Sequence, residues 1–336
     1  MACACDKKDA QVAKVLFVDL EAHRVTGSSL FFVDLLKRRF DVDVAYVTSR
    51  HSPKMPKASE VAGYDCVVCW QVTPSNIRAL SYGKPLIYVP MYDGETGNVV
   101  RWMRNRLQGI RAISFCRAEG ALLRKAGVDA LDVSYCPPLG ERVQGDLKKV
   151  FFWERGGIRA DEVSRMFPPE SGFEVVVRSG AFKEGDDARR SYLKALSECG
   201  VFVAPRRLEG IGLGFLEAMA IGKCVVAEDA PTMNEYICNG NNGVLVNVDK
   251  VGNGGLRLRP EDVASIQDKA YESCSDGRRR WEAVGEPAIL DFIDRAIAGR
   301  RRMTIAETVK WWLLMPLHFV RDIKTLADVT WRRVKS

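Results

Sequence analysis

The sequence has 336 residues, and at roughly 100 to 200 residues per domain this length favours two domains. Hydrophobic residues make up 47% of the chain and charged residues 28%, which excludes the disordered and fibrous classes of protein. The net charge of +7 first indicates a polyanionic partner, but residues 300–336 hold nine basic and three acidic side chains. Residues 1–299 are therefore nearly neutral, and the excess charge belongs to a C-terminal tail.

Strand-like and helix-like segments alternate in the first half of the chain. Apolar runs rich in β-branched residues predict the following strands: 12–20, 42–49, 64–72, 84–91, 112–116 and 131–136. Helical spacing predicts the intervening helices: 30–39, 98–109 and 118–127. Undivided apolar strands joined by helices indicate a parallel sheet with both faces covered. Pro137 and Pro138 continue neither a helix nor a central strand, so we place an interdomain linker there.

The second half repeats this alternation. Its predicted strands are 148–155, 173–180, 200–206, 223–229 and 243–249. Its predicted helices are 160–168, 188–199, 214–222, 233–240 and 260–273. The predicted domains are residues 1–140 and 141–299, followed by the tail, 300–336. Open parallel sheets bind ligands beyond the carboxyl ends of their strands, so we expect a ligand cleft between the two domains.

Neither the cysteines nor the paired acids form a convincing metal site or disulfide framework. Residues 1–14 lack the apolar core of a signal peptide, so the ten cysteines are expected in a reducing cytoplasm. Cys66 and Cys69 form a C-x2-C pattern inside an apolar strand, with no second ligand pair at a zinc-site spacing. Asp41 and Asp43 imitate a metal-binding D-x-D but begin a strand. We therefore predict no metal.

A glycine-rich segment between a strand and a helix of the second half carries the strongest functional signal. Three alternating glycines lie there: Gly210, Gly212 and Gly214. Glycines let backbone N–H groups approach a ligand beside the positive N-terminal end of the helix, so we expect a phosphate group to bind there. The carboxylates of Glu209 and Glu217 can accept hydrogen bonds from the hydroxyl groups of a polyol. A nucleotide sugar carries both kinds of group.

Simpler interpretations of these residues compete with this one. The dinucleotide fingerprint G-x-G-x-x-G needs a glycine at position 215, where Phe215 stands. Glu217 alone is compatible with an ordinary residue near a helix N-terminus, where the helix dipole favours acids. Thr232 and Glu235 follow Pro231, and we interpret them as a capping box that opens a helix rather than as catalytic residues.

The segment EGIGLGFLEAMAIGKCVVAEDAP, from Glu209 to Pro231, resembles the donor-site signature of retaining GT-B glycosyltransferases of the family 4-like group, the glycosyl transferases group 1. The resemblance extends more loosely over residues 148–248. It implies an α/β fold of the GT-B type, with two Rossmann-like doubly wound domains facing a cleft. The second domain would hold most of the nucleotide-sugar donor and the first most of the acceptor, with no metal and no cofactor.

The resemblance assigns donor-site roles by position. Glu209 would contact the hydroxyls of the donor sugar and Glu217 those of the ribose. Loop residues would contact the sugar and phosphates: Gly210, Gly212, Leu213 and Gly214. The family usually neutralises the diphosphate with an Arg, here Arg155, and a Lys, but Asp161 stands where that Lys is expected. The candidates for the second cation are Arg159, or Arg178 with Lys183.

In the first domain the family has a glycine-rich turn after its first strand, which corresponds here to Gly27 and Ser28, and these residues would contact the donor. His23 lies just before this turn and would face the cleft, with a place on the surface as an equal alternative. Asp93 stands where the family often has a His-Asp pair, although Tyr92 replaces the histidine. The resemblance implies that Asp93 contacts the acceptor or the donor sugar.

The predicted function is retaining transfer of a hexose-type sugar from a UDP- or GDP-linked donor to a glycan or lipid-linked acceptor, in cell-surface polysaccharide or glycolipid synthesis. Breaking the anomeric C–O bond leaves negative charge on the diphosphate, which Arg, Lys and a helix end can stabilise. The alternative is a non-catalytic nucleotide-sugar-binding GT-B protein, motivated by the missing lysine and histidine. Nucleic acid is disfavoured as a partner, because no known nucleic-acid module accompanies the basic tail.

The tail combines basic residues with tryptophans. Its apolar run, residues 311–320, is far shorter than the ~20 residues that a spanning helix needs. Trp311, Trp312 and Trp331 beside Lys and Arg are typical of an amphipathic helix on a membrane surface. We therefore expect a cytoplasmic protein bound peripherally to the cytoplasmic face of the membrane. The alternative is that the tail packs on the first domain.

Removal of residues 303–336 is expected to release the protein from anionic liposomes, because each basic residue near an anionic surface contributes about 1 kcal/mol of binding free energy. Co-sedimentation of the full and shortened chains with liposomes measures this, and donor binding should not change. Equal sedimentation of both chains would refute membrane attachment.

Overall fold

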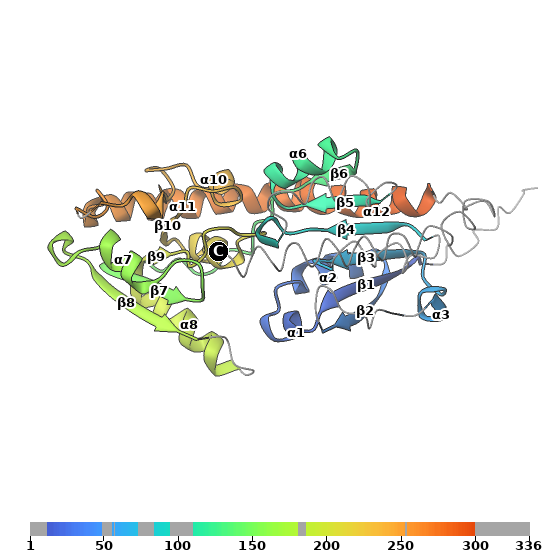
Figure 1. Cartoon of the computed structure of the whole chain (residues 1–336), viewed down its shortest axis with the longest axis horizontal. Coiled ribbons are helices and arrows are strands. Elements are labelled where there is room, and N and C mark those ends of the chain that lie inside the picture. Colours follow the sequence, from blue (N-terminus) through green and yellow to red (C-terminus); the bar gives the residue numbers. More distant parts are fainter. Residues whose placement is uncertain are drawn as a thin grey trace, which may run out of the picture.

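The computed structural model describes residues 12–48, 56, 58–72, 84–94, 110–180, 186–252 and 254–299. Two parallel sheets lie end to end with helices packed on their faces, as the two predicted α/β domains require (Figure 1). The strands of both sheets end toward the middle of the molecule, so their carboxyl ends face each other (Figure 1). The predicted helix 98–109, Lys183 and the tail lie outside the described residues.

The first sheet has six strands in the order β2-β1-β3-β4-β5-β6, and all neighbours are parallel. The strands are β1 (Lys14–Leu20), β2 (Asp41–Val47), β3 (Cys66–Trp70), β4 (Leu86–Val89), β5 (Arg111–Ser114) and β6 (Asp129–Asp132). The described helices are α1 (Ala22–Thr26), α2 (Leu30–Lys37), α3 (Ala58–Val61) and α6 (Arg117–Lys125), with a 3-10 turn η1 (Tyr92–Gly94). Strand order reverses between β1 and β3, which opens a crevice at their carboxyl ends.

The second sheet has five parallel strands in the order β11-β10-β9-β7-β8. The strands are β7 (Asp146–Glu154), β8 (Glu174–Ser179), β9 (Cys199–Val203), β10 (Cys224–Glu228) and β11 (Val244–Val246). Its helices include α7 (Ala160–Met166), α8 (Asp186–Glu198), α9 (Leu213–Ala220) and α10 (Met233–Tyr236). Strand order reverses between β7 and β9, so this sheet also has a switch point facing the first domain.

The central strands are buried on both faces, as their undivided apolar sequences predict. Every residue of β3 is buried, including Cys66 and Cys69, and burial raises the pKa of the Cys66 thiol to about 12. The described cysteines are free thiols. None of the helices in the described ranges has the length and apolar character needed to span a bilayer.

A long helix joins the two domains along one side (Figure 1). α11 (Pro260–Arg280) packs on α9 and on strands of the second sheet, whereas α12 (Glu286–Ala298) contacts β3 of the first. Five residues in π-helical conformation, Trp281–Gly285, connect them. The sequence pattern predicted a helix over 260–273 and placed residues up to 299 with the second domain, so it did not indicate this return to the first sheet.

Ion pairs fasten α12 to α2 of the first domain. Arg38 Nη1 lies 2.5 Å from Glu286 Oε2, and Arg39 Nη1 lies 2.6 Å from Asp291 and 2.9 Å from Asp294. Glu286 is buried, so its charge needs these partners more than an exposed carboxylate would. These contacts hold the end of the long helix on the first sheet.

Aromatic rings fill the junction where the chain crosses between the domains. The ring centroids of Phe31 and Tyr135 are 3.9 Å apart, and those of Tyr135 and Trp281 are 5.1 Å apart. Arg278 Nη1 donates a hydrogen bond to the carbonyl oxygen of Cys136, at 3.2 Å. The linker and the long helix therefore cross side by side in one packed core that includes residues of both domains.

Candidate active site

The loop after β9 meets the first domain through a glycine. A Cβ placed on Gly210 would lie 2.7 Å from the Cβ and Sδ atoms of Met91, closer than real Cβ contacts allow. Met91 follows β4 at the carboxyl end of the first sheet. Glycine therefore permits this close approach, which brings the neighbouring Glu209 against the first domain.

Glu209 lies in a cluster of charges drawn from both domains. The pKa of Glu209 is raised to about 7: burial and the charge of Asp93 raise it, while Arg206 and Arg155 lower it. Arg206 Nη1 donates to Asp93 Oδ2 across the domain boundary, at 3.0 Å. Among the described residues, the buried Oδ1 of Asp93 has no hydrogen-bond partner. The cluster thus joins two carboxylates and two guanidinium groups.

Arg155 follows β7 and occupies the position predicted for it. Its guanidinium carbon lies 5.5 Å from the centroid of the Trp153 ring, which is within the range of a cation–π contact. Burial lowers the pKa of Arg155, and the charge of Arg206 lowers it further. Because the two guanidinium groups repel each other, binding of an anion between or beside them would be favourable.

Gly212 sets the start of α9. It has φ +82°, a left-handed conformation, and a Cβ there would overlap the ring of Phe215. A Cβ on Gly214 would meet no atom within 4 Å, so the surface there is open. Glu217 lies farther along α9, and its charge adds to burial in raising the pKa of Tyr135, while Arg278 lowers it.

The predicted acceptor-side residue His23 and the predicted donor-binding residues Gly27 and Ser28 lie after β1, at the carboxyl end of the first sheet. Gly27 ends α1 with φ +67°, and Ser28 follows it. The buried carboxylate of Asp19 lies 2.6 Å from His23 Nδ1 and accepts a 2.5 Å hydrogen bond from Ser29 Oγ. A buried acid thus orients the ring of His23. Sequence analysis did not identify Asp19 as a site residue, although an acidic residue near the end of an apolar strand could have indicated one.

Arg206, which sequence analysis missed, is a second cation near Glu209 besides Arg155. Arg178 lies in the edge strand β8 and is exposed. Arg159 is paired with Asp161, at 2.9 Å, before α7. Arg206 follows a strand and precedes the glycine-rich loop by a few residues, and this position could have identified it.

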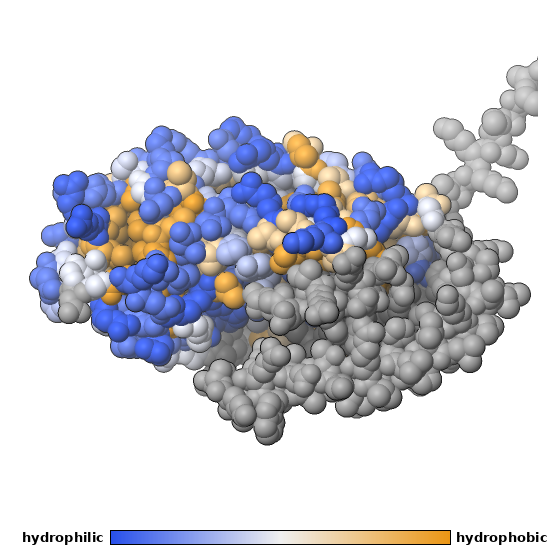
Figure 2. Space-filling view, turned by 45° about the horizontal axis from the view of Figure 1, so that its top comes forward, coloured by the Kyte–Doolittle hydropathy of each residue, from blue (hydrophilic) through white to orange (hydrophobic). Residues whose placement is uncertain are grey.

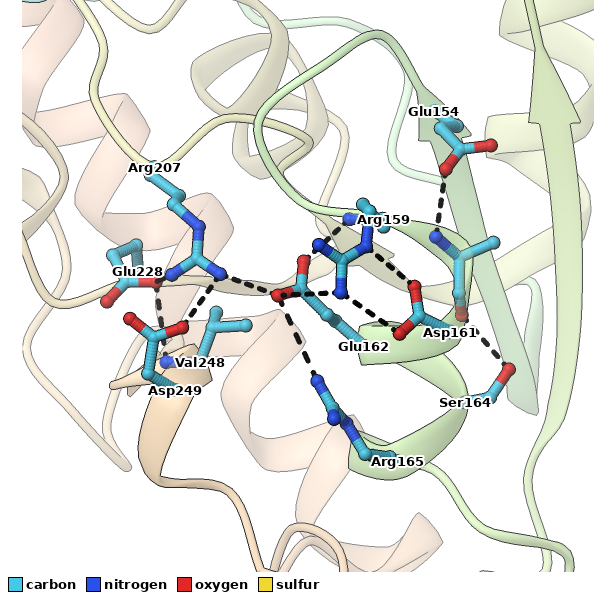
Figure 3. A network of polar contacts seen from close by, with 11 residues as sticks. Glu154, Arg159, Asp161, Glu162, Ser164, Arg165, Arg207, Glu228, Val248 and Asp249 are labelled. Atoms are coloured by element: carbon cyan, nitrogen blue, oxygen red, sulfur yellow. Dashed lines mark hydrogen bonds and ion pairs between the residues drawn. The ribbon is translucent and has the colours of Figure 1, made fainter. Parts of the chain in front are cut away.

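Arg207 anchors the same loop to the second sheet (Figure 3). Its guanidinium lies 2.7 Å from Glu162, 3.0 Å from Asp249 and 3.6 Å from Glu228. Glu162 is buried and also accepts a hydrogen bond from the backbone N–H of Arg159. Arg207 is thus bound by acids of the second domain, whereas the adjacent Arg206 donates to Asp93 of the first.

The interpretation of Thr232 and Glu235 as a capping box is wrong. The side chain of Thr232 makes no cap hydrogen bond; it donates instead to the carbonyl oxygen of Glu209, at 2.7 Å. The carboxylate of Glu235 accepts hydrogen bonds from the backbone N–H groups of Arg117 and Ala118 in the first domain, at 2.9 and 3.3 Å. The local pattern was compatible with a cap, but contacts distant in sequence determine where both side chains point.

Two other features lie apart from this cluster. A cavity of about 450 Å³ lies between β11 and α11, with Val244, Leu245 and Asp262 among its lining residues. Hydrophobic residues also gather on the surface of the second domain (Figure 2). Within the described ranges, no group of three or more His, Cys, Asp or Glu side chains could hold a metal ion. The converging charges, rather than the cavity, define the candidate site.

Comparison with known families supports the sequence signature. Residues 182–252 match the family described as glycosyl transferases group 1, and this range contains Glu209, Gly212 and Glu217. No curated protein matches the chain significantly in sequence.

Solved structures share the fold. Sucrose-phosphate synthase from Thermosynechococcus elongatus matches with a TM-score of 0.61 at 12% identity, covering 85% of this chain and 100% of that one. HepE from Anabaena, in complex with UDP-glucose, matches with a TM-score of 0.53 at 15% identity and the same coverage. A glycosyltransferase from Rickettsia africae matches with a TM-score of 0.54 at 11% identity, covering 83% of this chain and 99% of that one. The fold is therefore that of the GT-B glycosyltransferases.

Replacement of Glu209 by Gln is expected to stabilise the protein at high pH. A neutral Glu209 favours folding below its ordinary pKa of 4.5, and this contribution is lost as the pH rises through the folded value of about 7. Above pH 7 the Glu209→Gln variant, which has no charge to bury, should be more stable by on the order of 2 kcal/mol. Denaturant unfolding at pH 4.5 and pH 8 measures the difference.

The matched control is Glu170→Gln, which changes an exposed carboxylate and should alter the free energy of unfolding by less than about 0.5 kcal/mol. A Glu209→Gln variant with the same pH profile as the wild type would contradict the burial of this charge.

Proposed function

We propose that the protein is a glycosyltransferase that moves a hexose-type sugar from a nucleotide-diphosphate donor, UDP- or GDP-linked, to a glycan or lipid-linked acceptor. The observation that carries this proposal is the convergence of Arg155, Arg206 and Glu209 beside the glycine-rich loop, where the carboxyl ends of both sheets meet. The matched family and the UDP-glucose bound by HepE support this donor class.

The two arginines can stabilise the diphosphate leaving group. As the anomeric C–O bond breaks, negative charge grows on the diphosphate, and groups already positioned around it stabilise this charge most effectively. Arg155 and Arg206 supply two positive charges, and the N-terminus of α9 at Gly212 adds the positive end of a helix dipole. We propose that these groups act without a metal ion.

The carboxylates suit the donor's hydroxyl groups. Glu209 accepts hydrogen bonds from the sugar in our proposal, and Glu217, farther along α9, accepts them from the ribose. The nearby arginines oppose the rise in the pKa of Glu209 that burial causes, and the ionised carboxylate is the stronger hydrogen-bond acceptor. We further propose retention of configuration, with the leaving phosphate taking the proton of the acceptor hydroxyl.

The first domain is proposed to hold the acceptor. His23, oriented by Asp19, lies at its carboxyl edge next to the turn at Gly27 and Ser28, which we propose contacts the donor, and Asp93 is bonded to Arg206 beside Glu209. A lipid-linked acceptor of cell-surface polysaccharide or glycolipid synthesis would agree with a basic tail on the cytoplasmic face of the membrane.

A panel of UDP-, GDP-, ADP- and dTDP-sugars is expected to contain one donor that stabilises the protein. A ligand at 100 times its Kd adds about 2.7 kcal/mol to the free energy of unfolding, which thermal unfolding detects. With that donor and a suitable acceptor, Glu209→Ala and Glu217→Ala should fold normally but lower transfer at least about a hundredfold.

Full turnover by both variants would reject these roles. Stabilisation by a donor without transfer or hydrolysis in the wild type would instead identify a non-catalytic nucleotide-sugar-binding protein.

Arg206→Ala is expected to weaken donor binding about tenfold to a hundredfold, because a hydrogen bond to a charged group contributes about 1.5–3 kcal/mol. Arg178→Ala is the matched control, since Arg178 is an exposed arginine in the edge strand of the same sheet. Calorimetric titration with the stabilising donor measures both. Equal losses of donor affinity in the two variants would show that Arg206 does not contribute specifically to binding of the diphosphate.

A further inference from the structure

Thr232 has a backbone conformation that is costly for its residue type. Its φ is +77° and its ψ is −62°, and its side chain is fully buried. A β-branched residue rarely adopts a positive φ, because Cβ crowds the backbone. Gln71 is the one other non-glycine with positive φ among the described residues. Such strain persists where surrounding contacts impose it, and it is concentrated at functional sites.

The hydroxyl of Thr232 holds the backbone of Glu209. Its Oγ1 donates to the carbonyl oxygen of Glu209 at 2.7 Å, and the carbonyl oxygen of Gly210 lies 3.5 Å away. These two residues form the part of the loop that approaches Met91 of the first domain. The strained residue therefore fixes the segment that carries the candidate sugar-binding carboxylate.

Glu235, in the same helical turn, is bonded to the first domain. Its Oε2 accepts from the N–H of Arg117 at 2.9 Å, and its Oε1 lies 3.3 Å from both the N–H of Ala118 and the Sγ of Cys116. Burial raises the pKa of Cys116 to about 11, so its thiol keeps its proton and donates it. The Glu235 carboxylate thus accepts hydrogen bonds from backbone N–H groups in the first turn of α6, which have no acceptor within the helix. The helix dipole favours negative charge at this end.

One turn of the chain connects these two contacts. The N–H of Glu235 donates to the carbonyl oxygen of Thr232 at 3.2 Å, so both residues belong to the first turn of α10. This turn is bonded to the first domain on one side and to the Glu209 loop on the other. Movement of α6 relative to the second domain would therefore act on Thr232 through Glu235.

We propose that Thr232 is a positioning residue that couples the docking of α6 on Glu235 to the placement of Glu209. This inference rests on the proposed sugar transfer. When the domains meet, Glu235 binds the start of α6, and the Thr232 hydroxyl holds Glu209 in the geometry that the reaction needs. When they separate, Glu209 loses that geometry, so transfer requires the closed arrangement.

The test compares Thr232→Val with Thr232→Ser. Valine keeps the β-branched shape but removes the donor, whereas serine keeps the donor. Thr232→Val should lower kcat about tenfold to a hundredfold, the effect expected when a reacting group is slightly misplaced, and change the donor KM less than threefold. Thr232→Ser should recover kcat to within threefold of the wild type. Ser171→Ala, which removes a hydroxyl donating to the Pro168 carbonyl oxygen at 2.6 Å outside the site, should leave kcat within twofold.

A second variant tests the coupling itself. Glu235→Gln should lower kcat in the same direction, and the double variant with Thr232→Val should be no slower than the slower single variant, because both changes break one connection. Additive losses, an unchanged kcat in Thr232→Val, or failure of Thr232→Ser to recover activity would overturn the proposal. If Thr232→Val does not fold, an unchanged kcat in Glu235→Gln would overturn it and a loss of kcat would support it.

Amide hydrogen exchange separates this inference from the proposed function. Glu235→Gln should speed exchange in residues 205–212, and Thr232→Val should speed it at 116–120, because coupling between two sites is reciprocal. Unchanged exchange at both segments would overturn the coupling. Reciprocal exchange effects in a protein that transfers no sugar would support the coupling and reject the proposed transfer.

Discussion

The close contact between Gly210 and Met91 is the constraint on which the candidate site depends. Because Gly210 has no side chain, the loop can approach Met91 this closely, and the approach places Glu209 against the first domain. The burial that raises the pKa of Glu209, its proximity to Asp93 and the Arg206–Asp93 bond all require the loop to lie there. The absence of one Cβ thus allows two domains to contribute charges to a single cluster.

Two sets of contacts keep this loop in place, and they differ in kind. Arg207 is surrounded by the acids Glu162, Glu228 and Asp249 of the second domain, which fixes the base of the loop within its own sheet. The Thr232 hydroxyl fixes the tip of the loop through a turn that is itself bonded to the first domain. The base is therefore independent of the domain arrangement, whereas the tip is sensitive to it.

The sequence predicted the strands closely, because buried parallel strands are continuous apolar runs. The long motif pointed to Glu209, and the looser resemblance outside it pointed to Arg155. The sequence could not predict the partners of Glu235, because Arg117 lies 118 residues away and nothing in a local pattern encodes that contact. Arg206 was missed for the same reason, since its partner Asp93 is in the other domain.

The side-by-side crossing of the linker and the long helix limits how the domains can move. Two connections that touch, at Tyr135 and Trp281, behave as one short pivot, because neither can lengthen without pulling on the other. Rotation about this pivot displaces atoms in proportion to their distance from it. A few degrees of opening would then disturb the distant polar contacts between the domains while leaving the aromatic packing at the pivot nearly intact.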